Sequence, residues 1–101
     1  GNIEVMVGVT AGDKVHSIAI LRHKETPGLG ARIEDASFRD NFSGRPAEKT
    51  RWVVRKDGGD IDAITAATIS SRAVVAAVRQ GIDVYLDNRG RITGAPTKDN
   101  D

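Results

Sequence analysis

Residues 69–87 read ISSRAVVAAVRQGIDVYLD, the longest periodic run in this chain. Its apolar positions lie three or four residues apart and so share one face of a helix: Val75, Val78, Ile82 and Leu86, flanked by Val74 and Tyr85. The run predicts a long helix with one buried side. We expect it to stop at residues 88–90, where Gly90 offers a left-handed cap.

The start of the chain predicts a β-hairpin for this helix to cover. Apolar residues alternate with others through residues 3–9, and residues 15–21 resume a strand-like pattern after the turn residues 11–14. A helix with one apolar side buries it against such a sheet. The predicted fold class is therefore α+β, with a small antiparallel sheet packed against a long C-terminal helix.

The segment between hairpin and helix gives shorter signals. Residues 32–42 predict an amphipathic helix with Phe38 and Phe42 on one face beside Ile33. Residues 52–54 predict a short strand that ends at the turn KDGGD, residues 56–60.

Trp52 and Tyr85 are expected in the core, since the chain has few other aromatic residues. The polar residues 93–101 are expected to be a mobile tail.

Composition limits the range of functions. A chain of 101 residues suits a single domain, residues 1–101, and 15 Lys and Arg against 14 Asp and Glu is too balanced for an electrostatic nucleic-acid binder. The absence of cysteine excludes disulfides and zinc-cysteine or iron–sulfur sites, and we predict no metal site. No run approaches the roughly 20 apolar residues of a membrane span, so a soluble piece is expected.

Residues 62–68, DAITAAT, stand directly before the helical run. They place the hydroxyls of Thr65 and Thr68 where a helix presents unpaired N–H groups and the positive end of its dipole. Such a place suits a phosphate. The alternative is that Thr68 or Ser70 simply caps the helix.

Residues 25–30, ETPGLG, form a second unusual segment. Pro27 restricts the backbone and Gly28 frees it, as in a type II turn, so that N–H groups can approach the edge of a planar ring. The alternative is a rigid surface turn.

Four motifs, in this order, resemble the flavin-binding domain of the RnfG and NqrC subunits of ion-translocating electron-transport complexes, and RnfG more closely. They are ETPGLG at residues 25–30, KDGGD at 56–60, TAAT at 65–68 and SSRAVV at 70–75. The resemblance spans roughly residues 3–86. Ala66 stands where the family usually has Gly.

The resemblance implies an FMN attached as a phosphoester to Thr68 by a separate flavin transferase. Around the phosphate it places Thr65, Ala66, Ala67 and Ser71, with the Thr65 and Ser71 hydroxyls as possible donors. The isoalloxazine would contact the other motif through Glu25, Thr26, Gly28, Leu29 and Gly30.

The resemblance also implies a place for the domain. It would be an electron-transfer unit without catalytic residues of its own, on the extracytoplasmic (periplasmic) side of the membrane, beside the other membrane subunits of an Rnf-type complex. A membrane anchor is expected N-terminal to this fragment.

Other classes fit less well. A serine hydrolase using Ser70 or Ser71 lacks a nucleophile-elbow pattern, and a phosphate-loop nucleotide binder lacks its Gly-Lys-Ser/Thr run. A non-redox extracytoplasmic interaction module that keeps the fold without flavin stays an alternative, favoured by Ala66. Colour separates it from a covalent flavoprotein, which stays yellow after denaturation.

Overall fold

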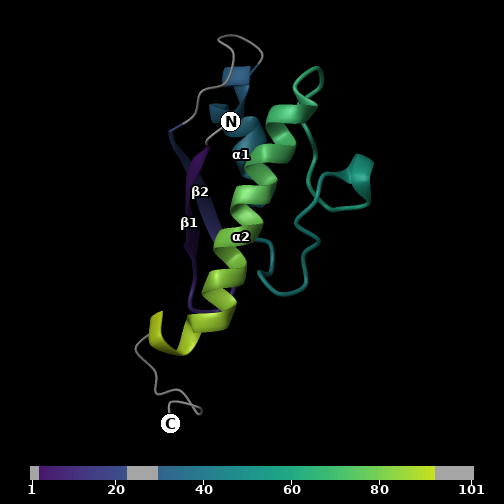
Figure 1. The fold of residues 1–101 in the computed structure, drawn as a ribbon. Coiled ribbons are helices and arrows are strands. Elements are labelled where there is room, and N and C mark those ends of the chain that lie inside the picture. The colour runs from purple at the N-terminus through teal and green to yellow at the C-terminus, as the bar shows by residue number, and fades with distance from the viewer. Residues whose placement is uncertain (1–2, 23–29, 93–101) are drawn as a thin grey trace.

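The computed structural model describes residues 3–22 and 30–92 (Figure 1). A hairpin of β1 (Glu4–Val9) and β2 (Val15–Arg22) lies along one side of the long helix α2 (Thr68–Ile92). Short helical turns pack near β2 and the start of α2: η1 (Gly30–Glu34), α1 (Ala36–Arg39) and η2 (Asp40–Phe42). This arrangement confirms the predicted α+β class with an antiparallel sheet and a C-terminal helix.

The hairpin turns one face to the core. Val5 pairs with Ile20 and Val7 with Ile18 in the antiparallel register, and these residues are buried or packed against the buried cluster. Met6, from the opposite face of β1, is 58% exposed. The alternation seen in the sequence therefore marks the sheet face that α2 covers.

Helix α2 is longer than the sequence indicates. It begins at Thr68 and continues through residues 88–90 to Ile92, so the predicted stop at these residues was wrong. The Asn88 side-chain amide donates to the carbonyl of Val84 at 2.9 Å, one turn back within the helix. Asn88 therefore adds a bond to the helix instead of ending it.

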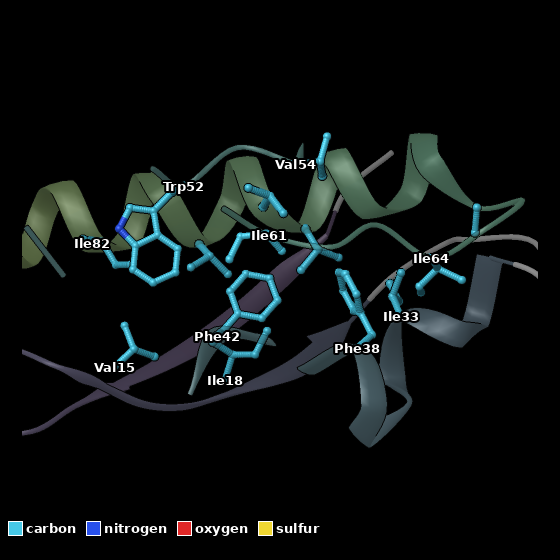
Figure 2. Close-up of a cluster of buried hydrophobic side chains, with 14 of the residues drawn as sticks. Val15, Ile18, Ile33, Phe38, Phe42, Trp52, Val54, Ile61, Ile64 and Ile82 are labelled. Atoms are coloured by element: carbon cyan, nitrogen blue, oxygen red, sulfur yellow. The ribbon is translucent and has the colours of Figure 1, made fainter. Parts of the chain in front are cut away.

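The core is one continuous cluster between α2, the hairpin and the connecting segment (Figure 2). Phe42 lies at its centre, edge-on to Phe38 at 5.5 Å between ring centroids and stacked on Trp52 at 6.2 Å. The Trp52 indole N–H donates to the buried carbonyl of Ala47 at 2.9 Å. Trp52 and Tyr85 are both buried, as expected.

The predicted helix over residues 32–42 is broken into three pieces. Asp35 has extended backbone angles (φ −66°, ψ 139°), so η1 stops before it and α1 starts after it. Both Phe38 and Arg39 donate their N–H groups to the Asp35 carbonyl, which begins the new helix. The face was nevertheless predicted correctly, because Ile33, Phe38 and Phe42 are all buried.

Residues 52–54 do not form the predicted strand. Val54 makes an isolated parallel bridge to Ile61, and the chain then enters the short helical turn η3 (Arg55–Asp57). The KDGGD turn folds back onto the segment before it, and Gly59 and Ile61 donate to the carbonyls of Val54 and Val53. These loop bonds replace the ladder that a strand would need.

No helix in the described ranges is long and apolar enough to cross a membrane. Helix α2 has the length, but it presents Arg72, Arg79 and Asp83 on its exposed side.

Gly59 gives a sharp test of this loop. A Cβ at this position would lie 1.8 Å from the carbonyl oxygen of Val53, so Gly59→Ala must move backbone and should cost about 3 kcal/mol or more in unfolding free energy. Gly44→Ala is the matched control: its φ of +79° is strained for alanine, but nothing lies within 4 Å, so the loss should be about 1 kcal/mol. Urea unfolding of both variants measures the difference, and equal losses would contradict the packing at Gly59.

Candidate functional site

The site begins with the turn that leads into α2. The N–H of Ala67 donates to the carbonyl of Ile64 at 2.9 Å, which closes a four-residue turn over Thr65 and Ala66. Ala66 has a φ of 70°, whereas Thr65 is not among the residues with positive φ. A positive φ at the third position alone defines a type II turn, in which glycine is the preferred residue. Ala66 therefore occupies a left-handed position in spite of its β-carbon.

Ser71 holds this turn against the first turn of α2. Its side chain is fully buried, and its hydroxyl accepts from the Ile64 N–H and donates to the Ala67 carbonyl, both at 2.9 Å. The Ser71 N–H also donates to Ala67 at 3.0 Å. The hydroxyl proton is thus directed into the turn and not toward the exposed side where a phosphate would lie.

The four hydroxyls around the helix start differ in exposure. Thr65 is exposed and Thr68, the first residue of α2, is half-buried. Ser70 and Ser71 are buried, at 9% and 0% exposure. Thr65 and Thr68 are therefore the two hydroxyl residues at the helix start that are not buried.

An ion pair ties the KDGGD turn to α2. The Arg72 guanidinium donates two hydrogen bonds to the Asp57 carboxylate, at 2.7 and 2.8 Å. This hydrogen bonding lowers the pKa of Asp57 from its ordinary value of 3.8 and raises that of Arg72. Asp57 and Arg72 belong to two of the motifs found in the sequence, so these motifs are joined in space.

A pocket of about 310 Å³ opens beside the turn. Its apolar wall is formed by Phe38, Ala63 and Ile64, and its polar residues are Arg32, Ser37, Asn41, Asp62 and Thr65. Figure 2 shows Phe38, Ile33 and Ile64 together at one end of the core. The volume lies within the range of small-molecule sites, and the lining is mainly polar with three apolar side chains.

A larger hollow of about 360 Å³ flanks α2 near Trp52, Arg72 and Arg79. No residue of the 62–68 segment lines it. The pocket beside Thr65 is therefore the one that belongs to the helix start.

The structure brings together part of the predicted site. Thr65, Ala66 and Ala67 lie in the turn, and Thr68 and Ser71 follow it in the first turn of α2, where Ser71 is hydrogen-bonded to Ile64 and Ala67. Glu25, Thr26, Gly28 and Leu29 lie outside the described residues, and Gly30 is the first residue of η1.

Sequence reasoning missed Arg32 and Asn41, which line the same pocket as Thr65. Arg32 could have been suspected because it follows the ETPGLG motif by two residues.

Comparison with known proteins places the chain in a family. It belongs to the FMN-binding domain family, whose sequence model matches residues 1–83. Over 101 residues it is 41% identical to a subunit, designated G, of the ion-translocating oxidoreductase complex of Aliivibrio fischeri, with 95% of this chain and 48% of that protein covered. The protein of the same name from Pseudomonas aeruginosa is 42% identical over 98 residues, covering 91% and 45%. The chain thus spans about half the length of these curated relatives.

Ala66 can be tested without any cofactor. Ala66→Gly should raise the unfolding free energy by about 1 kcal/mol, because it removes the β-carbon from a left-handed position. Ala76→Gly, on an exposed position inside α2, should instead lower it by about 1 kcal/mol. Denaturant unfolding of the two variants measures the sign of each change in unfolding free energy. A lower unfolding free energy for Ala66→Gly would contradict the positive φ at this residue.

The Asp57–Arg72 pair predicts an acid-sensitive contribution to stability. Because the pKa of Asp57 is lowered by folding, its contribution is complete above 3.8 and is lost as the pH falls through the lower folded value. Asp57→Asn should therefore lower the melting temperature near neutral pH and reduce its further drop below about pH 4. Asp87→Asn, an exposed carboxylate with no ion pair seen in the described part of the chain, should keep the wild-type profile. Thermal melts across pH measure both variants. If the melting temperature of Asp57→Asn fell below about pH 4 as steeply as that of the wild type, the ion pair would make no acid-sensitive contribution to stability.

Proposed function

We propose that this chain carries one FMN as a phosphoester on Thr68 and acts as the electron-transfer domain of an ion-translocating oxidoreductase complex. The observation that carries the proposal is the position of Thr68, a half-buried residue that begins α2 directly after a turn held by two hydrogen bonds of the Ser71 hydroxyl. The chain's membership of the FMN-binding domain family supports the choice of cofactor.

Retention of the cofactor explains why a covalent bond is needed. A helix N-terminus contributes about 0.3–2 kcal/mol toward binding an anion, which is at most roughly a thirtyfold gain in affinity. That gain alone would not hold a phosphorylated cofactor at low concentration. An ester to Thr68 Oγ1 keeps the phosphate at the N–H groups of the helix start, where the dipole stabilises its remaining negative charge.

Burial supports the choice of Thr68 among the neighbouring hydroxyls. Ser71 is closed off and its proton is given to Ala67, and Ser70 is buried. Thr65 is exposed but belongs to the turn and lines the adjacent pocket. Thr68 is then the accessible hydroxyl on the helix itself.

A separate flavin transferase must supply the activation. A threonine hydroxyl needs a base near neutral pH, and in the described part of the chain His16 lies on β2, where its ring contacts Ser17 at 3.0 Å. No histidine stands within residues 62–71. Net formation of the ester joins FMN to Thr68 with loss of one water.

The pocket beside the turn provides a place for the isoalloxazine. Phe38, Ala63 and Ile64 offer an apolar wall, while Asn41 and Thr65 offer polar groups at the rim. The loop at residues 25–30 stays our proposed second contact, through Glu25, Thr26, Gly28, Leu29 and Gly30. When bound, FMN supplies the redox chemistry, and the chain orients the ring and shields it from water on one side.

The relatives' shared name gives the wider setting. We place the domain on the extracytoplasmic side of a cytoplasmic membrane, in contact with the other subunits of an Rnf-type complex that couples electron transfer to ion transport. No turnover is expected from this domain alone.

Mass spectrometry tests the attachment. Co-expression with a flavin transferase should add the mass of one FMN less one water, and peptide mapping should place the adduct on Thr68. Thr68→Ala should abolish the adduct, whereas Thr65→Ala, the matched control in the same turn, should keep it. An adduct on Thr65 or Ser70 would overturn the assignment. A folded chain that stays colourless with an active transferase would favour the non-redox interaction module.

A further inference from the structure

We propose that Arg32 sets the reduction potential of the bound flavin by pairing with the negative charge that the isoalloxazine gains on reduction. This inference rests on the proposed function and deepens it. Arg32 lies outside both the 65–68 motif and residues 25–30. It is connected to the proposed flavin site because it lines the pocket beside the turn.

The position of Arg32 is fixed by η1. This short helical turn contacts both β2 and α2, and its neighbour Ile33 is fully buried in the core, which anchors the backbone of Arg32. The Arg32 side chain lines the same pocket as Ala63, Ile64 and Thr65. A ring held in this pocket would lie beside both Thr65 and the Arg32 side chain.

The charges around the pocket leave Arg32 as its available cation. Among the described residues that line it, Arg32 carries the positive charge and Asp62 the negative one. Asp62 is hydrogen-bonded to the guanidinium of Arg55, which offsets its charge. Arg32 has a long contact of 3.7 Å to Asp35, and both side chains are about half-exposed. Such an exposed pair is weak, so a planar anion can compete for the guanidinium.

Reduction creates that anion. Two electrons and one proton convert the oxidised flavin into an anionic reduced form, with the proton on N5 and the charge shared by N1 and the C2 carbonyl. A second proton on N1 would neutralise it. A guanidinium beside N1 and the C2 carbonyl would stabilise the anion, so that N1 of the reduced flavin would be protonated less readily and the potential would rise.

Thr68 does not line the pocket, whereas Thr65 does. Arg32 is therefore assigned to the ring and not to the phosphate. Riboflavin, which has the ring without the phosphate, separates these two roles.

The first experiment uses the flavinylated chain and Arg32→Gln, with dithionite as the reductant and a dye of known potential as the reference. Arg32→Gln should keep the adduct mass, lower the potential by the equivalent of about a fivefold change in the reduction equilibrium, and increase the fraction of reduced flavin that takes up the second proton at a given pH. Arg32→Lys keeps a positive charge and should give a potential between those of the wild type and Arg32→Gln. Arg79→Gln removes one positive charge from α2, where Arg79 lines a different pocket, and should leave the potential unchanged.

The second experiment does not depend on covalent attachment. In a Thr68→Ala background, Arg32→Gln should weaken the binding of dithionite-reduced riboflavin about fivefold, measured by fluorescence under argon. A loss of FMN binding with unchanged riboflavin binding would assign Arg32 to the phosphate and overturn the inference. A wild-type potential and proton uptake in flavinylated Arg32→Gln would also overturn it, while the adduct itself would still support the proposed function. Failure of wild-type attachment would count against the proposed function alone, because the riboflavin titration still decides the role of Arg32.

Discussion

Burial of the apolar stripe on α2 is the interaction on which the other elements depend. Val74, Val78 and Ile82 are fully or almost fully buried, and each such side chain contributes about 1.5–3 kcal/mol when it leaves water. A two-stranded hairpin is marginal in water by itself, so β1 and β2 persist because α2 covers one face. The aromatic column of Phe38, Phe42 and Trp52 then fills the space that the hairpin alone cannot close.

This packing also determines where the candidate site can be. Packing of α2 against the hairpin fixes the position of its first residue. The chain before α2 must then reverse its direction within a few residues. Ala66 makes that reversal at a φ of 70°, and the Ser71 hydroxyl bridges Ile64 and Ala67 across it. The side of the turn that faces the protein is therefore closed by hydrogen bonds, while Thr65 and Thr68 stay accessible.

The sequence predicted those parts of the fold that arise from regular periodicity. The spacing in residues 69–87 and the alternation in residues 3–9 report burial directly, and both elements are present. The strand predicted for residues 52–54 was wrong, because the N–H groups of Gly59 and Ile61 donate to carbonyls of that segment. This pairing is set by a glycine turn and not by β-propensity. For the site, the turn before α2 was visible as a motif. Arg32 was not, because its place beside Thr65 comes from tertiary packing between segments about thirty residues apart.

Placement of Thr68 on the first residue of a 25-residue helix has a mechanical consequence. A group esterified to a flexible loop can swing, and its distance to a redox partner then varies with the motion of the loop. A group on the first turn of α2 is joined to a backbone whose place is fixed, and the same helix is held further along by the hydrogen bond from the Tyr85 hydroxyl to Asp13 at 2.6 Å. The reach of such a group would be set by how the whole domain is oriented, so docking geometry would control the rate of electron transfer.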